Sequence, residues 1–384
     1  GISHFLEHMV FNGTRLYPEH KLIDALENMG VQVGTDLNAY TGFDETTYIL
    51  PIPLNNPDNF AKSMGILEQL AFNATLLPAD IDQERSVIME EWRTSGLSAA
   101  ARQQEHNLKI TTAGSLYAER MPIGKTEVIQ HAPPQVLRDF YKRWYRPNLM
   151  SVVVVGDIDP AQAKKLIEKH FASYQNPNPS TPTPVNTLPN NTAPLVGVFN
   201  DKTLTQSTVM IANKDAKDFV ALNTIGGYVE TLRNSLMVSM INQRLQAQLD
   251  TPASTPPFLQ AGVELDYMSG LVRSKQALQW YAIAAPNQED KTLKALHDES
   301  LRIVQHGFTQ SELERAVREH LTFLNNDSNN FQKATEYVRG IVENEPLPEI
   351  EWERTMQKRY LPLIGLDEIN QLAKRIIQTN NRVA

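Results

Sequence analysis

Apolar and polar residues divide the chain into short segments that alternate between helix and strand. Apolar residues spaced three or four positions apart predict helices that begin near the following residues: Lys21, Asn59, Ile81, Pro134 and Pro160. Runs rich in β-branched and aromatic residues predict strands over residues 31–36, 46–50 and 151–156. Because helices and strands are mixed along the chain, the pattern favours an α+β fold.

A segment rich in proline, asparagine, serine and threonine, residues 176–194, divides the sequence. Its six prolines oppose both helix and central strand, at Pro177, Pro179, Pro182, Pro184, Pro189 and Pro194. We therefore predict a linker between a domain of residues 1–175 and a domain of residues 195–384. The second domain repeats the mixture, with strands predicted over 195–200, 206–211, 259–265 and 279–284, a long helix over 220–249, and then further helices.

Length and composition are those of a large globular protein and do not by themselves identify an activity. A chain of 384 residues with 41% hydrophobic residues predicts two domains with ordinary cores. The net charge of −8 argues against nucleic acid as the main partner, and the absence of cysteine excludes disulfides and thiol catalysis. No apolar run has the length of a membrane span. Because Gly1 directly precedes the first helical motif, we expect a fragment that lacks its natural N-terminus and any export signal.

His4, Glu7 and His8 form an H-x-x-E-H motif, the inverted arrangement of the zinc-protease helix. On a helix, positions i and i+4 lie on one face, so two imidazoles can bind one ion. The carboxylate of Glu7 can then accept a proton from the metal-bound water. The alternative is a surface helix that happens to carry two histidines. A catalytic zinc site needs a third protein ligand, which must come from elsewhere in the chain.

Glu91 is the best candidate for that third ligand. It ends the run 84–91, in which Val87 and Ile88 predict a buried stripe. Glu84 and Glu91 are seven positions apart and return to the same helix face, so one carboxylate can bind metal while the other supports it. Glu90 is the rival ligand, but it lies about 100° round the helix from Glu91. The alternative for the whole acidic helix is a solvated face.

The sequence resembles the pitrilysin, insulin-degrading enzyme and mitochondrial processing peptidase family of inverted zincins. The matching segments are residues 1–14, GISHFLEHMVFNGT, residues 84–91, ERSVIMEE, and residues 145–148, YRPN, which run into 151–157. The resemblance implies an α+β fold of two tandem similar domains, each an antiparallel-rich β-sheet packed with α-helices. Residues 8–14, HMVFNGT, are most similar to the corresponding segment of large bacterial members, many of which are periplasmic.

The resemblance also implies roles for individual residues. It makes His4, His8 and Glu91 the ligands of one Zn²⁺, Glu7 the general base and Glu84 a carboxylate that supports the site. Glu91 follows His8 by 83 positions, slightly more than the family usually shows, which implies a small loop insertion. Residues 195–384 are then a degenerate repeat without metal, and none of the histidines there lies in a zinc-binding motif: His297, His306 and His320.

The segment containing Asn38, Ala39 and Tyr40 resembles the strand at the edge of the family's sheet, which pairs with an extended substrate. Backbone pairing of this kind recognises shape and favours unfolded or flexible peptides. The alternative is a plain hairpin edge without a ligand.

Together these features predict a zinc-dependent endopeptidase that hydrolyses peptides or unfolded polypeptides. The resemblance further implies a second two-domain half, in the same chain or in a partner, and a periplasmic location. The alternative is a non-catalytic peptide-binding or structural subunit, but such subunits typically lack the full set of ligands and base. A purely structural zinc site is a third possibility, and it would need a fourth protein ligand, which is not evident.

Overall fold

The computed structural model describes residues 1–19, 21–32, 38–177, 182, 186–218, 223–250, 256–266, 272–323 and 329–384. Helices and antiparallel sheet are mixed along the chain, which confirms the predicted fold class. The chain forms two compact units, one of residues 1–102 and 120–185 and the other of residues 103–119 and 186–384. Each unit is described by itself.

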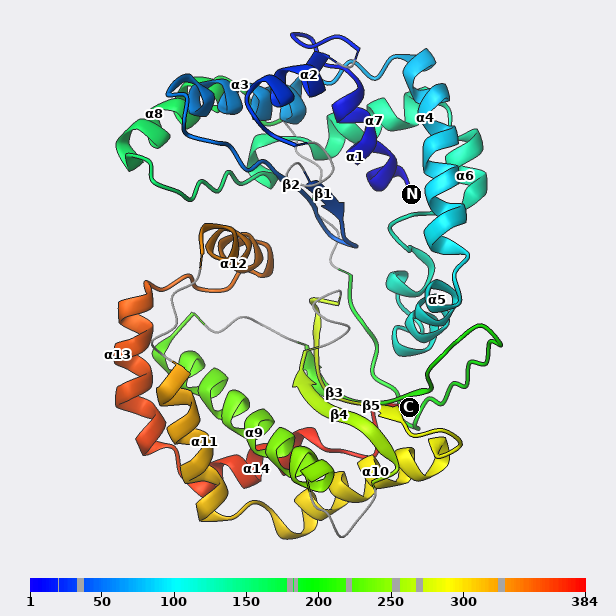
Figure 1. Cartoon of the computed structure of the whole chain (residues 1–384), viewed down its shortest axis with the longest axis vertical. Coiled ribbons are helices and arrows are strands. Elements are labelled where there is room, and N and C mark those ends of the chain that lie inside the picture. Colours follow the sequence, from blue (N-terminus) through cyan, green and yellow to red (C-terminus); the bar gives the residue numbers. More distant parts are fainter. Residues whose placement is uncertain are drawn as a thin grey trace. The chain divides into compact units, whose positions relative to one another are not determined.

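The first unit is mostly helical (Figure 1). Its helices are α1 (Ile2–Asn12), α2 (Lys21–Asn28), α3 (Asp58–Phe72), α4 (Pro78–Glu91), α6 (Thr126–His131), α7 (Pro134–Trp144) and α8 (Pro160–Phe171). A π-helical turn, Trp92–Gly96, follows α4 directly, and a short 3₁₀ turn lies at Pro147–Leu149, whereas the 3₁₀ turn at Leu116–Glu119 belongs to the second unit. Helix α5 (Ala99–Thr111) begins in this unit, while its later residues group with the second unit.

Helix α1 lies in the core of the first unit. Phe5, Leu6, Met9 and Val10 on this helix are almost completely buried. They pack in one cluster with apolar residues of α2, α3, α4, α6 and α7. Burial of such side chains stabilises the fold by about 1.5–3 kcal/mol each. The motif at the start of the chain is therefore carried on a tightly packed element, which restricts the motion of its polar side chains.

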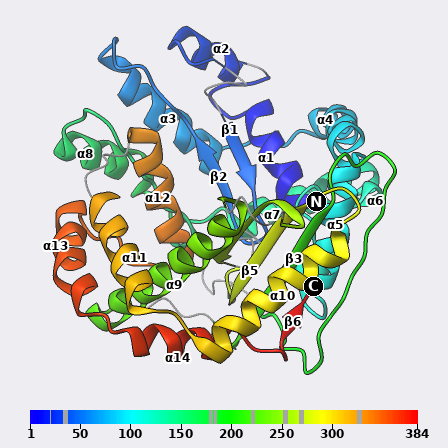
Figure 2. The same ribbon diagram turned by 60° about the horizontal axis from the view of Figure 1, so that its bottom comes forward.

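A two-stranded hairpin lies beside α1. Strand β1 (Asn38–Thr41) pairs with β2 (Thr46–Ile49) in antiparallel register, with Thr41 opposite Thr46. The strand predicted over residues 46–50 is thus present, whereas most of the one predicted over 31–36 falls outside the described residues. Figure 2 shows the hairpin and α1 side by side from a second direction, as in Figure 1.

The second unit contains a four-stranded antiparallel sheet of order β4-β5-β3-β6. Its strands are β3 (Thr208–Asp218), β4 (Phe258–Leu265), β5 (Lys275–Ala284) and β6 (Arg382–Val383). Its helices are α9 (Ile225–Asp250), α10 (Glu289–His306), α11 (Gln310–Phe323), α12 (Asn330–Glu343), α13 (Ile350–Tyr360) and α14 (Leu366–Ile376), with a 3₁₀ turn at Leu361–Leu363. Side chains of β3, β4, β5, α9, α10, α11 and α14 form its core around the buried Trp280.

Two strand predictions differ from the structure. Residues 151–156 form no ladder with any strand among the described residues, although Val152 to Val155 are half-buried. A β-branched run favours an extended backbone, but a strand also needs a neighbour to pair with. Within the described part of the chain, residues 195–200 form no named strand, but they make a parallel bridge between Leu195 and Val383, and the amide of Gly197 donates to the carbonyl of Ala384.

Helices α5 and α6 were not predicted. Both are short of large apolar residues in a helical spacing, so the pattern did not show them.

Candidate active site

Helix α1 presents His4 and His8 on one face. The two residues are one turn apart, and their ring centroids lie 4.8 Å from each other. The apolar residues between and after them are buried in the core, which fixes the rotation of the helix and directs this face towards α4. The sequence predicted this pairing from spacing alone.

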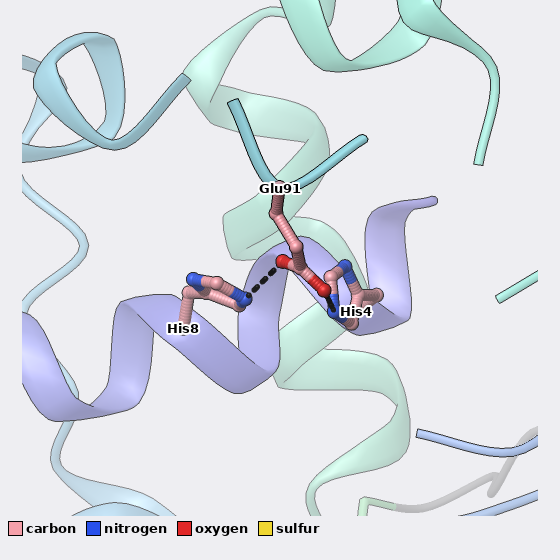
Figure 3. A group of neighbouring side chains, drawn as sticks. All are labelled: His4, His8 and Glu91. Carbon is pink, nitrogen blue, oxygen red and sulfur yellow. Dashed lines mark ion pairs between the residues drawn. The ribbon is translucent and has the colours of Figure 1, made fainter. Parts of the chain in front are cut away.

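Glu91, the last residue of α4, lies between the two imidazoles (Figure 3). Its Oε1 is 3.5 Å from Nε2 of His4, and its Oε2 is 3.3 Å from Nε2 of His8. The side chain of Glu91 is 40% exposed, so the cluster is open to solvent on one side. The hydrogen bonds to His4 and then to His8 lower the pKa of the Glu91 carboxyl, so Glu91 is available as an ionised ligand.

The three side chains fit a divalent metal ion. Their candidate ligand atoms all lie within 4.8 Å of one another. In a tetrahedral site with bonds of about 2.1 Å, two ligand atoms lie about 3.4 Å apart, close to both measured nitrogen–oxygen distances. Two imidazoles and one carboxylate are a donor set of catalytic zinc sites. Among the described residues, no fourth such side chain joins this group, and this leaves one position for water.

Glu84, two turns before Glu91 on α4, holds the far side of His8. Its Oε1 lies 2.9 Å from Nδ1 of His8, and Asn12 donates to its Oε2 at 2.7 Å. A carboxylate at Nδ1 fixes the ring tautomer and leaves the lone pair of Nε2 for a metal. Burial disfavours a proton on His8, but the hydrogen bonds to Glu84 and Glu91 outweigh it and raise its pKa to about 9, so a metal ion that binds Nε2 would have to displace a proton.

The neighbouring Glu90 points elsewhere. Both of its carboxylate oxygens accept hydrogen bonds from Arg93, at 2.6 and 2.9 Å, and these bonds lower the pKa of the exposed Glu90 carboxyl.

The buried stripe predicted on α4 is only half correct. Ile88 is fully buried but Val87 is 50% exposed, because the two residues lie about 100° apart and the helix packs through a narrower face.

Glu7, the candidate general base, is also on α1 but one position before His8. Its side chain is only 8% exposed, and Thr41 at the end of β1 donates a hydrogen bond to its Oε2. The hydroxyls of Thr41 and Thr46 lie 3.4 Å apart, and that of Thr46 is 3.1 Å from Ser3. The sequence did not identify these hydroxyls, because nothing local connects residues 41 and 46 with a helix at the start of the chain.

A buried pair of tyrosines supports the hairpin next to Glu7. The hydroxyls of Tyr48 and Tyr145 are hydrogen-bonded to each other, and Tyr145 also bonds to Thr46. Burial raises the pKa of Tyr145 to about 12, and it raises that of Tyr48 as well. Both phenols therefore stay neutral and act as hydrogen-bonding groups that hold β2 in place.

Strand β1 has one open edge among the described residues, since its only partner there is β2. The amide of Gly42 donates to the carbonyl of Glu45, so pairs 42–45 and 40–47 bond across the hairpin and residues 39 and 41 direct their amides and carbonyls to the open edge. Asn38 and Tyr40 are exposed and Ala39 is half-buried. The predicted substrate-binding residues thus lie on a strand whose second edge has no partner strand among the described residues.

Two family models match this chain. One, described as insulinase (peptidase family M16), matches residues 1–116, and the other, described as the peptidase M16 inactive domain, matches residues 132–319. The chain belongs to peptidase family M16. The three residues of the candidate metal site and Glu7 all fall within the first match.

Curated M16 relatives include two bacterial proteins named probable zinc protease PqqL. The one from Haemophilus influenzae is 30% identical over 382 residues, which cover 97% of this chain and 40% of that protein. The one from Escherichia coli is 31% identical over 389 residues, which cover 98% of this chain and 39% of that protein. The chain therefore spans about two fifths of the length of these relatives.

Solved structures agree with this assignment. The crystal structure of the first half of the periplasmic protease PqqL from Escherichia coli has a TM-score of 0.90 at 27% identity, covering all of this chain and 81% of that one. Pitrilysin has a TM-score of 0.70 at 14% identity and covers all of this chain and 40% of that one, which shows the shared fold. Among the described residues, no helix of the chain is both long and apolar enough to cross a membrane.

Proposed function

We propose that this chain is the metal-bearing half of a zinc-dependent endopeptidase of family M16. The observation that carries the proposal is the convergence of His4, His8 and Glu91, with Glu7 on the adjoining face of the same helix. Three ligands with an open position are the donor arrangement of hydrolytic zinc sites. A structural zinc site would use four protein ligands, and the described residues supply three.

Each residue has a part in the proposed reaction. Zinc, when bound, supplies a water molecule of lowered pKa and polarises the scissile carbonyl. Glu7 accepts the proton of the attacking water and returns it to the leaving amine. Glu84 holds His8 in the tautomer that leaves Nε2 free, and Glu91 balances the charge of a divalent ion. No covalent intermediate with the protein is needed.

The substrate proposed for this site is an extended segment of a peptide or unfolded polypeptide. It would add as a strand to the open edge of β1, along Asn38, Ala39 and Tyr40. Main-chain hydrogen bonds would supply affinity with little dependence on sequence, while alternate side chains would set the cleavage preference. A folded substrate cannot offer a free strand, so flexible chains are preferred.

The M16 relatives are longer than this chain, and this extra length supports a second half in the whole protein. We infer a two-domain second half, in the same chain or in a partner, that closes a chamber over the zinc site. We infer a periplasmic location from the similarity to the periplasmic protease PqqL.

A non-catalytic, peptide-binding role is the second candidate function. It is favoured by the match of residues 132–319 to a model described as an inactive domain. In the second unit that match covers strands β3, β4 and β5 with helices α9, α10 and most of α11, whereas the ligands and base lie outside it. The two functions differ in a single measurable property, which is turnover.

The test is metal analysis of the full-length protein together with cleavage of an unstructured peptide library. The proposal expects about one zinc per chain and hydrolysis that chelation abolishes and added zinc restores. Stoichiometric zinc with peptide binding but no cleavage would establish the binding role. A protein that holds no zinc would overturn both the site and the reaction.

A further inference from the structure

The β1–β2 hairpin is hydrogen-bonded to helix α1 through Ser3 and Glu7. Ser3 and Glu7 are four positions apart, as are His4 and His8, so α1 carries two neighbouring polar faces. The histidine face is directed to Glu91 on α4, and the Ser3–Glu7 face is directed to the threonines of the hairpin. Glu7 therefore lies at the border between the metal ligands and the proposed substrate strand.

The threonine that reaches Glu7 belongs to the open edge itself. The alternation along β1 directs the amide and carbonyl of Thr41 to the side where another strand can add. Its side chain points to the face that packs on α1, where it donates to Oε2 of Glu7. One residue thus joins the backbone edge to the carboxylate.

The hydroxyl network gives this contact a direction. A hydroxyl has one proton, and Thr41 uses it for the carboxylate. The Thr41 oxygen can then only accept, and Thr46 lies 3.4 Å away to donate to it. The Thr46 hydroxyl also lies 3.1 Å from that of Ser3 and is hydrogen-bonded to Tyr145. The Thr41 hydroxyl, which donates to Glu7, therefore lies within a cluster of hydroxyl groups on the α1 side of the hairpin.

We propose that Thr41 is a positioning residue for Glu7, and that it links strand addition on β1 to the alignment of the general base. The inference rests on the proposed function. When a substrate strand fixes the Thr41 backbone, the same residue holds the carboxylate oxygen, so substrate and base are aligned together. Removal of the hydroxyl would leave the strand edge and the zinc ligands in place but would free the Glu7 side chain to turn.

The experiment compares three variants of the full-length protein: Thr41→Val, Thr41→Ser and Thr47→Val. Thr41→Val keeps the shape and loses the hydroxyl, whereas Thr41→Ser keeps the hydroxyl. Thr47→Val is the matched control, because Thr47 is the next residue after Thr46 and its side chain lies on the opposite face of the hairpin. Zinc content, melting temperature, kcat and KM are measured for each.

We expect Thr41→Val to lower kcat by about 10- to 100-fold, the usual effect of losing a group that orients a catalytic residue. Its KM, zinc content and melting temperature should stay at the wild-type values. Thr41→Ser should restore most of kcat, and Thr47→Val should resemble the wild type. In a Glu7→Gln background, where turnover is lost, adding Thr41→Val should leave the affinity for peptide unchanged.

Several outcomes would overturn the inference. These are a wild-type kcat in Thr41→Val, a Thr41→Ser enzyme as slow as Thr41→Val, or a loss of peptide affinity in the Glu7→Gln background. Glu7→Gln alone separates this from the proposed function. If Glu7→Gln is inactive while Thr41→Val is fully active, only the link through Thr41 fails. If Glu7→Gln keeps wild-type activity, the assignment of the base itself is wrong.

Discussion

The Nδ1 atom of His8 lies 2.9 Å from Oε1 of Glu84. This contact joins helix α1, which carries the histidines, to helix α4, on which Glu91 lies two turns after Glu84. Because the far nitrogen of His8 is already engaged, the near nitrogen is left facing Glu91 at 3.3 Å. The geometry of the candidate metal site thus depends on a carboxylate that is not itself a proposed ligand.

Replacing Glu84 should weaken zinc binding without removing a ligand. We expect Glu84→Ala to lower zinc affinity by about 10- to 100-fold, since His8 loses the partner that fixes its tautomer and ring orientation. Asp82→Ala is the control, because Asp82 is on the same helix and its exposed side chain pairs with Arg85 instead. Competition with a chromogenic chelator measures both. Equal zinc affinity of the two variants would contradict the role of Glu84.

The third ligand can be identified by comparing adjacent carboxylates. Glu91→Ala should reduce zinc affinity far more than Glu90→Ala, because Glu91 lies between the imidazoles and Glu90 is paired with Arg93. Metal content after dialysis against a weak chelator is the measurement. If both variants retain zinc equally, the third ligand is another residue.

Glu7 should be needed for turnover and not for metal binding. We expect Glu7→Gln to keep one zinc per chain and to lose at least about 100-fold in kcat, because an amide of the same shape cannot accept the proton of water. Peptide hydrolysis and metal analysis on the same full-length preparation give the two values. Full zinc content with wild-type kcat is the result that this role does not allow.

The second unit should lose stability in acid through one ion pair. Glu312 binds Arg244 through both carboxylate oxygens and accepts a further hydrogen bond from the amide of Thr309. Burial opposes ionisation of Glu312, but these bonds outweigh it and lower its pKa to about 2, below its ordinary value of 4.5. The unfolded state therefore binds a proton first as the pH falls, and stability is lost between about pH 5 and pH 2.

Glu312→Gln should remove that part of the pH dependence. The variant should be less stable than the wild type at pH 7, and the difference should shrink as the pH falls towards 2. Denaturant unfolding at a series of pH values measures it, with the exposed Glu314→Gln as control. A difference that stays constant from pH 7 to pH 2 would show that the ion pair is not the cause.

The isolated chain should be a poorer peptidase than the full-length protein. It spans about 40% of its curated relatives, so a chamber closed by a second half would be open here. Loss of substrate orientation should lower kcat/KM by more than about 10-fold at matched zinc occupancy. Adding the remaining half in trans should restore part of it. Equal rates for the isolated chain and the intact protein would rule out the two-half chamber.

The sequence predicted those features that depend on residues close together in the chain. His4, Glu7 and His8 lie on one helix, and their relation follows from helical geometry. Glu91 was identified because it repeats the position of Glu84 after two turns, and the structure brings both residues to the histidines. In these cases the 3.6-residue period of the α-helix determines which side chains lie on the same face.

The periodicity of the sequence does not predict features that depend on a contact with a residue far along the chain. Thr41 was part of a predicted edge strand, but only the packing of the hairpin on α1 brings its hydroxyl to Glu7. The valines at 152–155 have the composition of a strand, yet pairing depends on a partner far along the chain. Val87 and Ile88 are equally apolar, and the position of the neighbouring helices decides which one is buried.

The order of the letters in H-x-x-E-H also decides on which side of the histidines the carboxylate lies. With 100° per residue, Glu7 is about 80° to one side of the centre of the pair, and a glutamate at position 5 would be about 80° to the other side. The first side meets the hairpin hydroxyls, while the second is occupied by Phe5, which is fully buried. The reversed motif H-E-x-x-H on this helix would replace the buried Phe5 ring, which packs in the core of the first unit, by a carboxylate, so the packing of α1 favours a base at position 7.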